Sequence, residues 1–392
     1  MSLVLFKFLL LFLATPWIRA ASIQKRSFRV DRIRNPNFVR HGPTELLRTY
    51  RKYRMPIPQG LLDALSQGTE DVAADPVRLG APKTPQLKQS PAVGHAVGLV
   101  SATPANQGIE YISPILVGGQ TVNVALDSGS ADLWVFSSRL PRSAKAGHQA
   151  YDHERSSSFK LIPGANFSIT YGDGTSAAGD VGTDTVDVGG ATVMGQAVQM
   201  ANAVSPAFVQ DTHLSGLLGL AFSQLSTVKP VKQRTFFENV MPDLAQPLFT
   251  ADLRKGSSGA FEFGRIDSTK FAGRLAWIGA DTSKGFWQVS TTGFTVGNGS
   301  TRFPPSQAIV DTGTTLMLVS KEIFDGYYSH VPGAQQDIGG MMFPCSAALP
   351  DLLIDVGGFY TARVHGAHVN FAKANGDRRL TVSICRLMLT CW

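Results

Sequence analysis

Two tetrapeptides of the same kind, Asp127-Ser128-Gly129-Ser130 and Asp311-Thr312-Gly313-Thr314, lie 184 positions apart and decide the fold class. Each follows a short apolar run, and each is followed by another, at residues 133–136 and 316–319. One such tetrapeptide arises by chance in roughly a few per cent of chains this long. The repeat with matched apolar flanks therefore predicts a duplicated body with one Asp from each half. The alternative is a pair of unrelated Asp-capped turns.

The residue types within each tetrapeptide suit a buried carboxylate at the floor of a cleft. A strand ends at the Asp, and the Gly lets the chain turn sharply with its backbone N–H near the carboxylate. The hydroxyl at the fourth position can donate to that carboxylate and hold it ionised. The candidate catalytic residues are Asp127 and Asp311, and the loop residues expected to bind substrate beside them are Gly129, Ser130, Gly313 and Thr314.

A pair of carboxylates a few ångströms apart predicts a particular chemistry. Both cannot stay charged, so the pair shares one proton and titrates as a unit. The ionised member can take a proton from a water that attacks a peptide carbonyl, while the protonated member donates to the carbonyl oxygen. This hydrolysis needs no metal and no cofactor, and we expect none.

The composition indicates a folded body made mainly of strands. Hydrophobic residues make up 43% of the 392 residues and charged residues 17%, and there are 39 Gly. Short apolar runs alternate with Gly, Asn, Asp and Ser between residues 111 and 190, which is typical of closely spaced strands and turns. Helices are expected only near residues 233–244 and 320–330. The predicted fold class is all-β.

The formal net charge of +7 comes from the N-terminal part of the chain. Residues 1–98 hold fifteen Lys and Arg against six Asp and Glu, whereas residues 99–392 hold twenty-one against twenty-three. The body has no basic stripe interleaved with aromatic residues, so nucleic acid is not an expected partner.

Residues 1–20 have the pattern of a signal peptide. Lys7 precedes the apolar run of residues 8–14, Pro16 follows it, and Ala20 is a small residue suited to a cleavage site. The run is shorter than the roughly 20 residues of a membrane span, so no membrane attachment is expected. The prediction is a secreted, extracellular protein; the alternative is a buried N-terminal helix.

Residues 21–98 read as a basic pro-segment followed by a linker. The segment is rich in Lys and Arg, and residues 81–91 have the Pro-, Gln- and Lys-rich composition of a linker. A basic segment before an acidic body suggests a removable part of a precursor. The alternative is a disordered basic tail.

The body from about residue 110 to about residue 377 resembles the pepsin family of aspartic proteases, most closely the secreted fungal penicillopepsin and aspergillopepsin branch. The matching stretches lie at residues 127–136, 169–174, 216–222, 246–249, 285–287 and 308–315. The resemblance implies a bilobal fold, with residues 99–275 as the N-terminal lobe and residues 276–392 as the C-terminal lobe. It also implies a monomer that acts on protein and peptide substrates.

The resemblance assigns Tyr171-Gly172-Asp173-Gly174 to a flap, a hairpin that closes over substrate and excludes water. Tyr171 would be the flap tyrosine, supported by Trp134. An Asp at position 173 resembles the fungal members that accept Lys at P1 beside large apolar side chains. The alternative for Tyr171 by itself is an ordinary hairpin aromatic.

Lys52-Tyr53 resembles the pro-segment dipeptide that lies across the two aspartates in pepsinogen-like zymogens. A Lys there would pair with the ionised aspartates at neutral pH, and acid would weaken the attraction and release the segment. The alternative is a Lys on a solvated helix face.

The resemblance stops near residue 377. The family's closing features, an apolar-apolar-Gly-Asp segment and the Tyr-rich strand that follows it, have no match in the remaining residues. An incomplete second lobe is therefore expected. Of the three cysteines, Cys345 matches the first second-lobe Cys of the family, Cys385 could stand in as its disulfide partner, and Cys391 has no counterpart.

Two functions from different classes follow. The first is an acid endopeptidase made as a secreted zymogen, which the intact Asp127 and Asp311 favour. The second is a catalytically impaired pepsin-like binding protein or the product of a broken gene model, which the divergent C-terminal residues favour. A carbohydrate- or wall-binding β-protein has little support beyond the β-rich texture.

Overall fold

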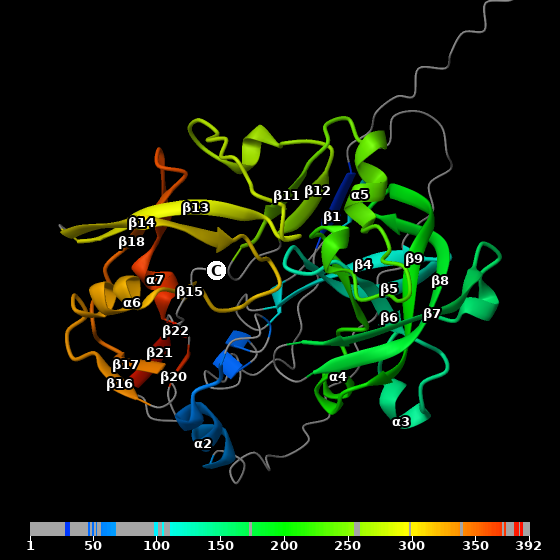
Figure 1. Cartoon of the computed structure of the whole chain (residues 1–392), viewed down its shortest axis with the longest axis horizontal. Helices are drawn as coiled ribbons and strands as arrows, with labels where there is room; N and C mark the ends of the chain where they lie inside the picture. The colour runs from blue at the N-terminus through cyan, green and yellow to red at the C-terminus, as the bar shows by residue number, and fades with distance from the viewer. Residues whose placement is uncertain are drawn as a thin grey trace, which may run out of the picture.

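The structure is a computed structural model of the whole chain, and it describes most of the body together with short parts of the N-terminal segment (Figure 1). The described residues are 28–31, 46–47, 49–50, 52, 56–67, 98–100, 104–105, 110–171, 175–254, 259–297, 299–337, 340–370, 372–373, 380–383 and 385–386. The predicted signal peptide at residues 1–20 lies outside this part of the chain.

The first lobe is built on one eight-stranded sheet, ordered β3-β4-β5-β10-β6-β9-β8-β7, and an extra pairing of β4 with β8 gives it a barrel-like form. Its strands are β3 (Pro104–Ala105), β4 (Glu110–Val117), β5 (Gln120–Asp127), β6 (Leu133–Phe136), β7 (Lys160–Thr170), β8 (Ser176–Val188), β9 (Ala191–Val204) and β10 (Gly216–Gly219). Strands dominate the described residues, as the sequence predicted.

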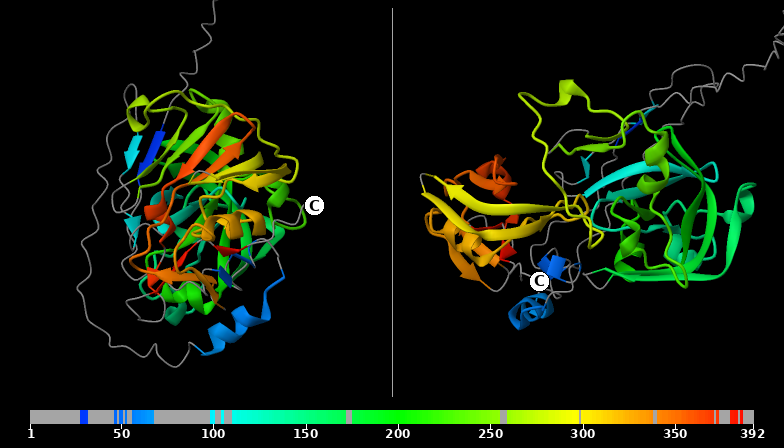
Figure 2. Two further views of the ribbon diagram at one scale, coloured as in Figure 1. Left: turned by 90° about the vertical axis from the view of Figure 1, so that its left-hand side faces the viewer. Right: turned by 45° about the horizontal axis from the view of Figure 1, so that its top comes forward.

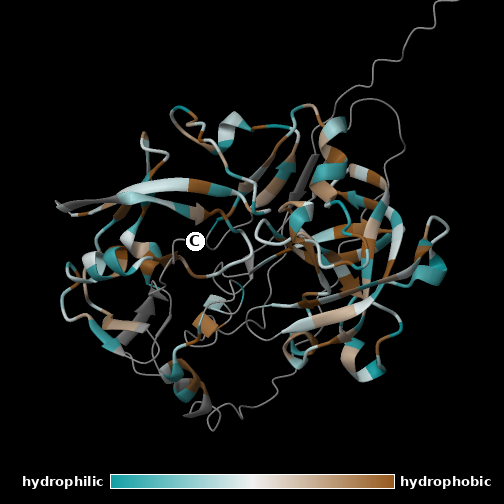
Figure 3. Ribbon diagram, in the orientation of Figure 1, coloured by the Kyte–Doolittle hydropathy of each residue, from teal (hydrophilic) through white to brown (hydrophobic). Residues whose placement is uncertain are grey.

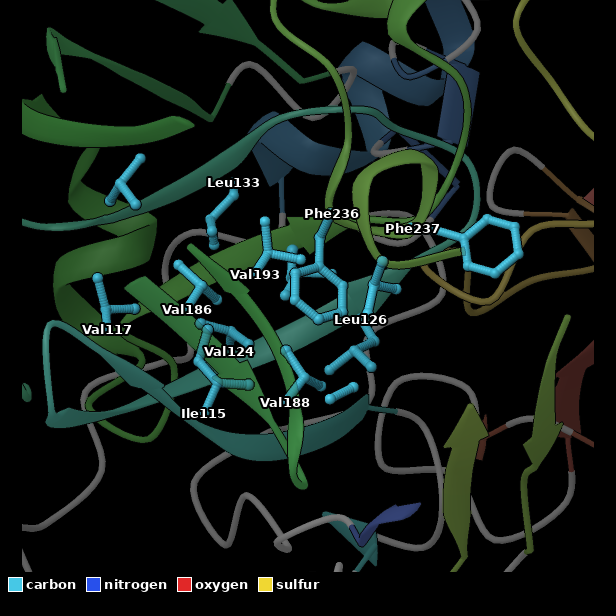
Figure 4. Packing of buried hydrophobic residues seen from close by; sticks show 14 of the residues in the cluster. Ile115, Val117, Val124, Leu126, Leu133, Val186, Val188, Val193, Phe236 and Phe237 are labelled. Carbon is cyan, nitrogen blue, oxygen red and sulfur yellow. The ribbon is translucent and has the colours of Figure 1, made fainter. Parts of the chain in front are cut away.

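Alternating burial along β5 explains why this strand leads into the site. Val122, Val124 and Leu126 face the core of the sheet, while the residues between them are less buried. The turn before β5 uses Gly118 and Gly119, whose φ angles of +53° and +75° favour glycine. Figure 4 shows these core side chains meeting others from β4, β8 and β9, beneath the helix that carries Phe236.

The described residues of the second lobe form three sheets. The first is ordered β14-β13-β18-β19, the second pairs β15 with β22, and the third is ordered β16-β17-β21-β20. The bounds are β13 (Gln288–Val296), β14 (Gly299–Ile309), β15 (Leu318–Val319), β16 (Gln335–Asp337), β17 (Gly340–Pro344), β18 (Leu352–Val356), β19 (Tyr360–Val364), β20 (Ala372–Lys373), β21 (Leu380–Ser383) and β22 (Cys385–Arg386). The right view of Figure 2 shows this lobe and the eight-stranded sheet as separate bodies.

A four-stranded sheet ordered β11-β12-β1-β2 brings the N-terminal segment into the fold. Its strands are β1 (Phe28–Asp31), β2 (Gly98–Val100), β11 (Phe249–Asp252) and β12 (Ala260–Phe263). β1 pairs antiparallel with β12 and parallel with β2. The segment predicted to be removable thus supplies a central strand of this sheet.

Helices are short and few among the described residues. The predicted helix near residues 233–244 is found as α5 (Phe236–Val240) and a 3₁₀ turn at Met241–Asp243, and the one near residues 320–330 is α6 (Lys321–Tyr328). The others are α2 (Gln59–Gln67), α3 (Arg142–Lys145), α4 (Pro206–Gln210) and α7 (Gly366–Val369). None of the helices in the described ranges is both long and apolar enough to cross a membrane.

Hydropathy follows this architecture. Brown, hydrophobic ribbon concentrates inside the eight-stranded sheet and on the inner side of α6, whereas loops and outer edges are teal (Figure 3). Inward residues of α6, among them Phe324 and Tyr327, pack with Phe294 of β13 and Phe343 of β17. Each lobe therefore has its own core, and the site must be assembled from loops that leave both.

β10 supports the first tetrapeptide by pairing with the strands on both sides of it. It pairs parallel with β5, so that Leu218 lies opposite Leu126 and Gly219 opposite Asp127, and antiparallel with β6. The strand entering Asp311 has a weaker support: within the described residues β14 is an edge strand paired only with β13. Val310, which follows β14, is 53% exposed. The two halves of the repeat are thus unequally supported.

Replacing Leu218 should destabilise the first lobe strongly. Its side chain is fully buried beneath the Asp127 loop, so Leu218→Ala removes contacts and leaves a cavity that costs about 2–5 kcal/mol of unfolding free energy. Leu253→Ala is the matched control, because Leu253 is 39% exposed and its loss should cost roughly 0.5 kcal/mol or less. Urea unfolding measures both; equal midpoints for the two variants would contradict the role of β10.

Candidate active site

Asp127 ends β5 and is held by its own loop. The backbone N–H of Gly129 donates to Asp127 Oδ1 at 2.9 Å, and the hydroxyl of Ser130 donates to Oδ2 at 2.6 Å. Asp127 is 1% exposed. The loop therefore satisfies a buried carboxylate with the two donors that the sequence pattern predicted.

Asp311 follows β14 and has the same set of donors. The backbone N–H of Gly313 donates to Asp311 Oδ1 at 2.8 Å, and the hydroxyl of Thr314 donates to Oδ2. The side chain of Asp311 is 4% exposed. The two tetrapeptides thus form equivalent loops, although the second lies in the less supported lobe.

The second residues of the two tetrapeptides join the loops directly. The backbone N–H of Ser128 donates to Thr312 Oγ1 at 3.0 Å, and that of Thr312 donates to Ser128 Oγ at 2.9 Å. Each hydroxyl then donates to the strand entering the opposite loop: Ser128 Oγ to Val310 O at 2.8 Å, and Thr312 Oγ1 to Leu126 O at 2.9 Å. Four hydrogen bonds therefore connect the lobes at the site.

This connection was missed by the sequence analysis, which gave the second position no role. The available signal was a hydroxyl residue at that position in both copies, Ser128 and Thr312. A hydroxyl can accept from one amide and donate to one carbonyl through a single atom, as this reciprocal arrangement requires.

The glycines are required because each faces the opposite carboxylate. A Cβ added to Gly129 would lie 2.6 Å from Asp311 Cγ, and one added to Gly313 would lie 2.2 Å from Asp127 Oδ1. The two aspartates also share a side-chain hydrogen bond. Any larger residue at these positions would separate the pair.

Lys52 of the N-terminal segment lies between the two carboxylates. Its Nζ is 3.0 Å from Asp127 Oδ1 and 2.7 Å from Asp311 Oδ2, and its side chain is only 14% exposed. The two aspartates thus share one bound ammonium group.

Burial and charge set opposite pKa shifts on the two aspartates. Burial raises the pKa of Asp127, and the charge of Asp311 raises it further, against the attraction of Lys52. Burial would also raise the pKa of Asp311, but the charge of Lys52 and hydrogen bonds from Asp127, Lys52 and Thr314 outweigh it and hold that pKa below its usual range. The pair is arranged to keep one proton and one negative charge.

The pKa of Lys52 shifts in the direction expected for a paired ammonium. Burial alone would lower it, but the charges of Asp127 and Asp311 and their hydrogen bonds raise it above its ordinary value. Lys52 therefore keeps its charge to a higher pH than an ordinary lysine.

Apolar packing around the site fixes the segment that carries Lys52. Leu46 and Leu61 of the segment pack against Leu316, which follows the second tetrapeptide. Partly buried residues extend this cluster: Leu47, Tyr50, Ile57, Leu65 and Leu318. Figure 1 shows α2 lying between the two lobes at one side of the molecule. Lys52 is thus held by burial of its neighbours as well as by its own charge.

Tyr171 lies at the end of β7, where a hairpin to β8 begins. Its backbone N–H donates to Thr175 O at 2.8 Å, and its hydroxyl accepts from Trp134 Nε1 at 2.6 Å. Trp134 is fully buried in β6, directly after the Asp127 loop. The indole therefore ties the base of the hairpin to the floor of the site.

Asp132 is a second residue that the sequence analysis gave no role. It is 2% exposed and accepts from Gln199 Nε2 at 2.8 Å, and from the hydroxyl and N–H of Thr227. Burial raises its pKa, while these hydrogen bonds act in the opposite direction. The carboxyl group anchors the turn that follows Asp127 to β9; an acidic residue inside an apolar run was the available signal.

The structure brings together most of the predicted site residues: Asp127, Gly129, Ser130, Asp311, Gly313, Thr314 and Lys52. The predicted roles of four others fall outside the described residues: Tyr53, Gly172, Asp173 and Gly174. Cys345 is exposed after β17, and the backbone of Cys385 lies in β22 with its side chain outside the described part, so their disulfide stays a prediction. No group of three or more potential metal-ligating side chains occurs in the part of the chain that is described.

The reciprocal hydroxyls should act as one unit. Ser128→Ala and Thr312→Val each remove a hydroxyl that makes two bonds between the loops, and each should cost about 1–3 kcal/mol of unfolding free energy. Each hydroxyl makes its own two bonds, but losing either pair loosens the contact between the loops and weakens the pair that remains, so the double variant should cost at least about 0.5 kcal/mol less than the sum. Urea unfolding of the four proteins measures this, and strictly additive losses would contradict it.

Comparison with known proteins matches this geometry. The family described as "Asp: Eukaryotic aspartyl protease" matches residues 110–389. Aspartic protease PEP3 of Coccidioides posadasii is 42% identical over 366 residues, which cover 92% of this chain and 81% of that protein.

Two further relatives match over shorter stretches. Aspergillopepsin-1 of Aspergillus flavus is 47% identical over 288 residues, covering 73% of this chain and 70% of that protein. Penicillopepsin-1 of Penicillium janthinellum is 48% identical over 284 residues, covering 72% and 86%. The chain therefore belongs to the eukaryotic aspartyl protease family, a family of endopeptidases, and is similar to its fungal pepsin-like members.

Proposed function

We propose that this chain is the zymogen of a secreted acid endopeptidase, in which Asp127 and Asp311 are the catalytic pair and Lys52 blocks them until acid releases the N-terminal segment. The observation that carries the proposal is the position of Lys52 Nζ, 3.0 Å from one carboxylate and 2.7 Å from the other. Secretion is supported by the signal-peptide pattern of residues 1–20.

The catalytic step follows from a pair that holds one proton. With Lys52 displaced, a water between the carboxylates loses a proton to the ionised aspartate as its oxygen attacks the peptide carbonyl. The protonated aspartate donates to the carbonyl oxygen, and a proton then passes to the leaving nitrogen as the C–N bond breaks. The donors from Gly129, Ser130, Gly313 and Thr314 hold both carboxylates in place throughout.

Lys52 prevents this step for two reasons. Its ammonium group occupies the space between the carboxylates where the water would be held. Its charge also acts to lower the pKa of Asp127, against the effect of burial, and so opposes the singly protonated state that catalysis uses. The zymogen is therefore inactive while the pair is intact.

Acid weakens the block in a definite order. Asp127 has the raised pKa, so it gains a proton first as the pH falls, and one of the two ion pairs is lost. The depressed pKa of Asp311 keeps the second pair until more acidic pH, because the stabilisation from an ionised carboxylate disappears only as the pH passes through its folded-state pKa. Protonation of other carboxylates of the body weakens the attraction for the basic segment, and we expect processing below about pH 5.

The substrate preference proposed for the active enzyme is a large apolar residue at P1, with Lys also accepted. The first part is supported by the aromatic side chains of Tyr171 and Trp134 beside the site. The second rests on Asp173 in the flap sequence, which is the residue type found in fungal relatives that accept Lys. The enzyme is proposed to act as a monomer on protein and peptide substrates.

Removing either carboxylate should abolish acid proteolysis. Asp127→Asn and Asp311→Asn keep the shape of the side chain but cannot share one proton, so kcat should fall by at least about a thousandfold. Cleavage of denatured haemoglobin and of peptides with Phe or Lys at P1, near pH 3–4, measures this. Asp252→Asn, an aspartate remote from the site in β11, is the matched control; full activity in either site variant would refute the assignment.

Neutralising Lys52 should move processing to higher pH. Lys52→Gln removes both ion pairs, so full-length protein should be processed about one pH unit closer to neutral than wild type. Lys88→Gln removes the same charge from the linker and should leave the pH of processing unchanged. Gel and mass analysis of pH-stepped samples follows the conversion. The zymogen proposal would be contradicted if wild-type protein stayed full-length in acid even with active protease added in trans.

A catalytically impaired binding protein is the second candidate, and the asymmetry of the site favours it. Asp311 follows an edge strand, Val310 is 53% exposed and the loop residue Gly313 is exposed, whereas the Asp127 loop is buried on β10. A folded, processed wild-type protein that binds a pepstatin-like inhibitor but cleaves nothing at acid pH would support this candidate over the enzyme.

A further inference from the structure

His148 makes an unusual pair of contacts in the loop after α3. Its Nδ1 is 2.9 Å from Leu214 O, and its Nε2 is 3.1 Å from Val209 O. Val209 lies in the last turn of α4, and Leu214 precedes β10. Both ring nitrogens of one histidine therefore face backbone carbonyl oxygens, which only accept hydrogen bonds.

This geometry favours a ring with two protons. A neutral imidazole donates from one nitrogen and turns a lone pair toward the second carbonyl, which leaves that contact repulsive. An imidazolium donates from both nitrogens and satisfies both carbonyls. Val209 O belongs to the end of a helix, where carbonyl groups lack helical partners and positive charge is favoured. The ring also stacks on Phe136 at 4.1 Å, an aromatic face that attracts a cation.

α4 connects His148 to the flap tyrosine. Phe208 of α4 packs edge-on against Trp134 at 4.9 Å and against Tyr171 at 5.9 Å. Phe136 stacks with Trp134 at 6.1 Å, and its ring also stacks with the ring of His148 at 4.1 Å. A continuous row of aromatic rings thus runs from the histidine to the base of the flap hairpin, and α4 is part of it.

We propose that His148 is a positioning residue whose doubly protonated ring clamps α4 to the turn before β10, and so holds Phe208 against Tyr171 and Trp134 at acid pH. This inference rests on the proposed function and extends it. An acid protease works at acid pH, which favours the doubly protonated ring that makes both hydrogen bonds. A ring with only one proton loses one of the two hydrogen bonds, and α4 is then less firmly held.

Titratable groups near His148 include His213, Asp211 and Lys145, and they differ in their effect on a positive charge at this place. His213 follows α4 in the same turn: burial lowers its pKa, Asp211 opposes that shift, and the positive charge of the His148 ring adds to it. His213 therefore loses its proton at a lower pH than an ordinary histidine. The positive charge of Lys145 in α3 disfavours a positive charge on His148, but the Lys145 ammonium group donates a hydrogen bond to Ser138 O.

The first test needs no catalytic turnover. Nitrogen-15 spectra of the histidine side chains in the full-length protein at about pH 5.5 should show protons on both nitrogens of His148, and at about pH 8 on one only. Asp127→Asn protein, which cannot digest itself, is the sample. A His148 ring with one unprotonated nitrogen at both pH values would overturn the clamp, whether or not the wild type proves to be a protease.

The second test uses kinetics with graded variants. His148→Phe keeps the stacking on Phe136 but donates to neither carbonyl, and should lower kcat/KM about tenfold at pH 5. His148→Asn and His148→Gln each supply one neutral donor and should recover part of the loss. The ratio of wild-type to His148→Gln activity should shrink as the pH rises from about 5.5 to about 7.5, the range in which histidines ordinarily titrate.

His153→Gln is the matched control for these variants. His153 lies on the same lobe, but its Nε2 contacts the guanidinium of Arg139, and its ring packs on Phe159 rather than on α4. Its replacement should leave the pH profile unchanged. A constant wild-type to His148→Gln ratio across this pH range, or His148→Phe activity equal to wild type, would overturn the positioning role.

Discussion

Two buried carboxylates brought together from two lobes are the constraint on which the rest of this structure depends. Like charges at short distance repel, and burial makes that repulsion larger, so the pair exists only because each oxygen has an assigned donor. Gly129 and Gly313 provide backbone N–H groups and the space for the opposite carboxylate. The reciprocal bonds of Ser128 and Thr312 prevent the loops from moving apart. In the unprocessed chain, Lys52 supplies the remaining compensation.

The two lobes support this arrangement unequally. Asp127 is supported by β10 below, by Asp132 in the following turn and by the aromatic residues that begin at Trp134. Asp311 relies on its own loop, on the hydroxyl bonds from the first lobe and on apolar packing of Leu316 with the N-terminal segment. The N-terminal segment thus contributes to the fold through β1 and Leu61 as well as to the site through Lys52.

The sequence predicted much of this because the information was local. A repeated Asp-Ser/Thr-Gly-Ser/Thr between apolar runs specifies a strand, a turn and two donors within four residues, and the structure contains both loops as expected. Two of the helices were placed from their residue patterns. What escaped depends on distant pairs: the bonds between Ser128 and Thr312 span 184 positions, and the contacts of His148 with Val209 and Leu214 span 61 and 66. The local pattern offers at most a hydroxyl at the second position of each tetrapeptide, and it does not identify the distant partner.

The central claim is that Lys52 occupies the space between Asp127 and Asp311 that substrate and water need. Isothermal calorimetry of a pepstatin-like inhibitor, which competes for that space, tests it most directly. Full-length and acid-processed Asp127→Asn protein, the latter cut by wild-type protease in trans, are compared at the same pH of about 5.5. The account predicts one bound inhibitor per processed chain and at least about a hundredfold weaker binding to the full-length chain. Equal affinity for the two forms would contradict it.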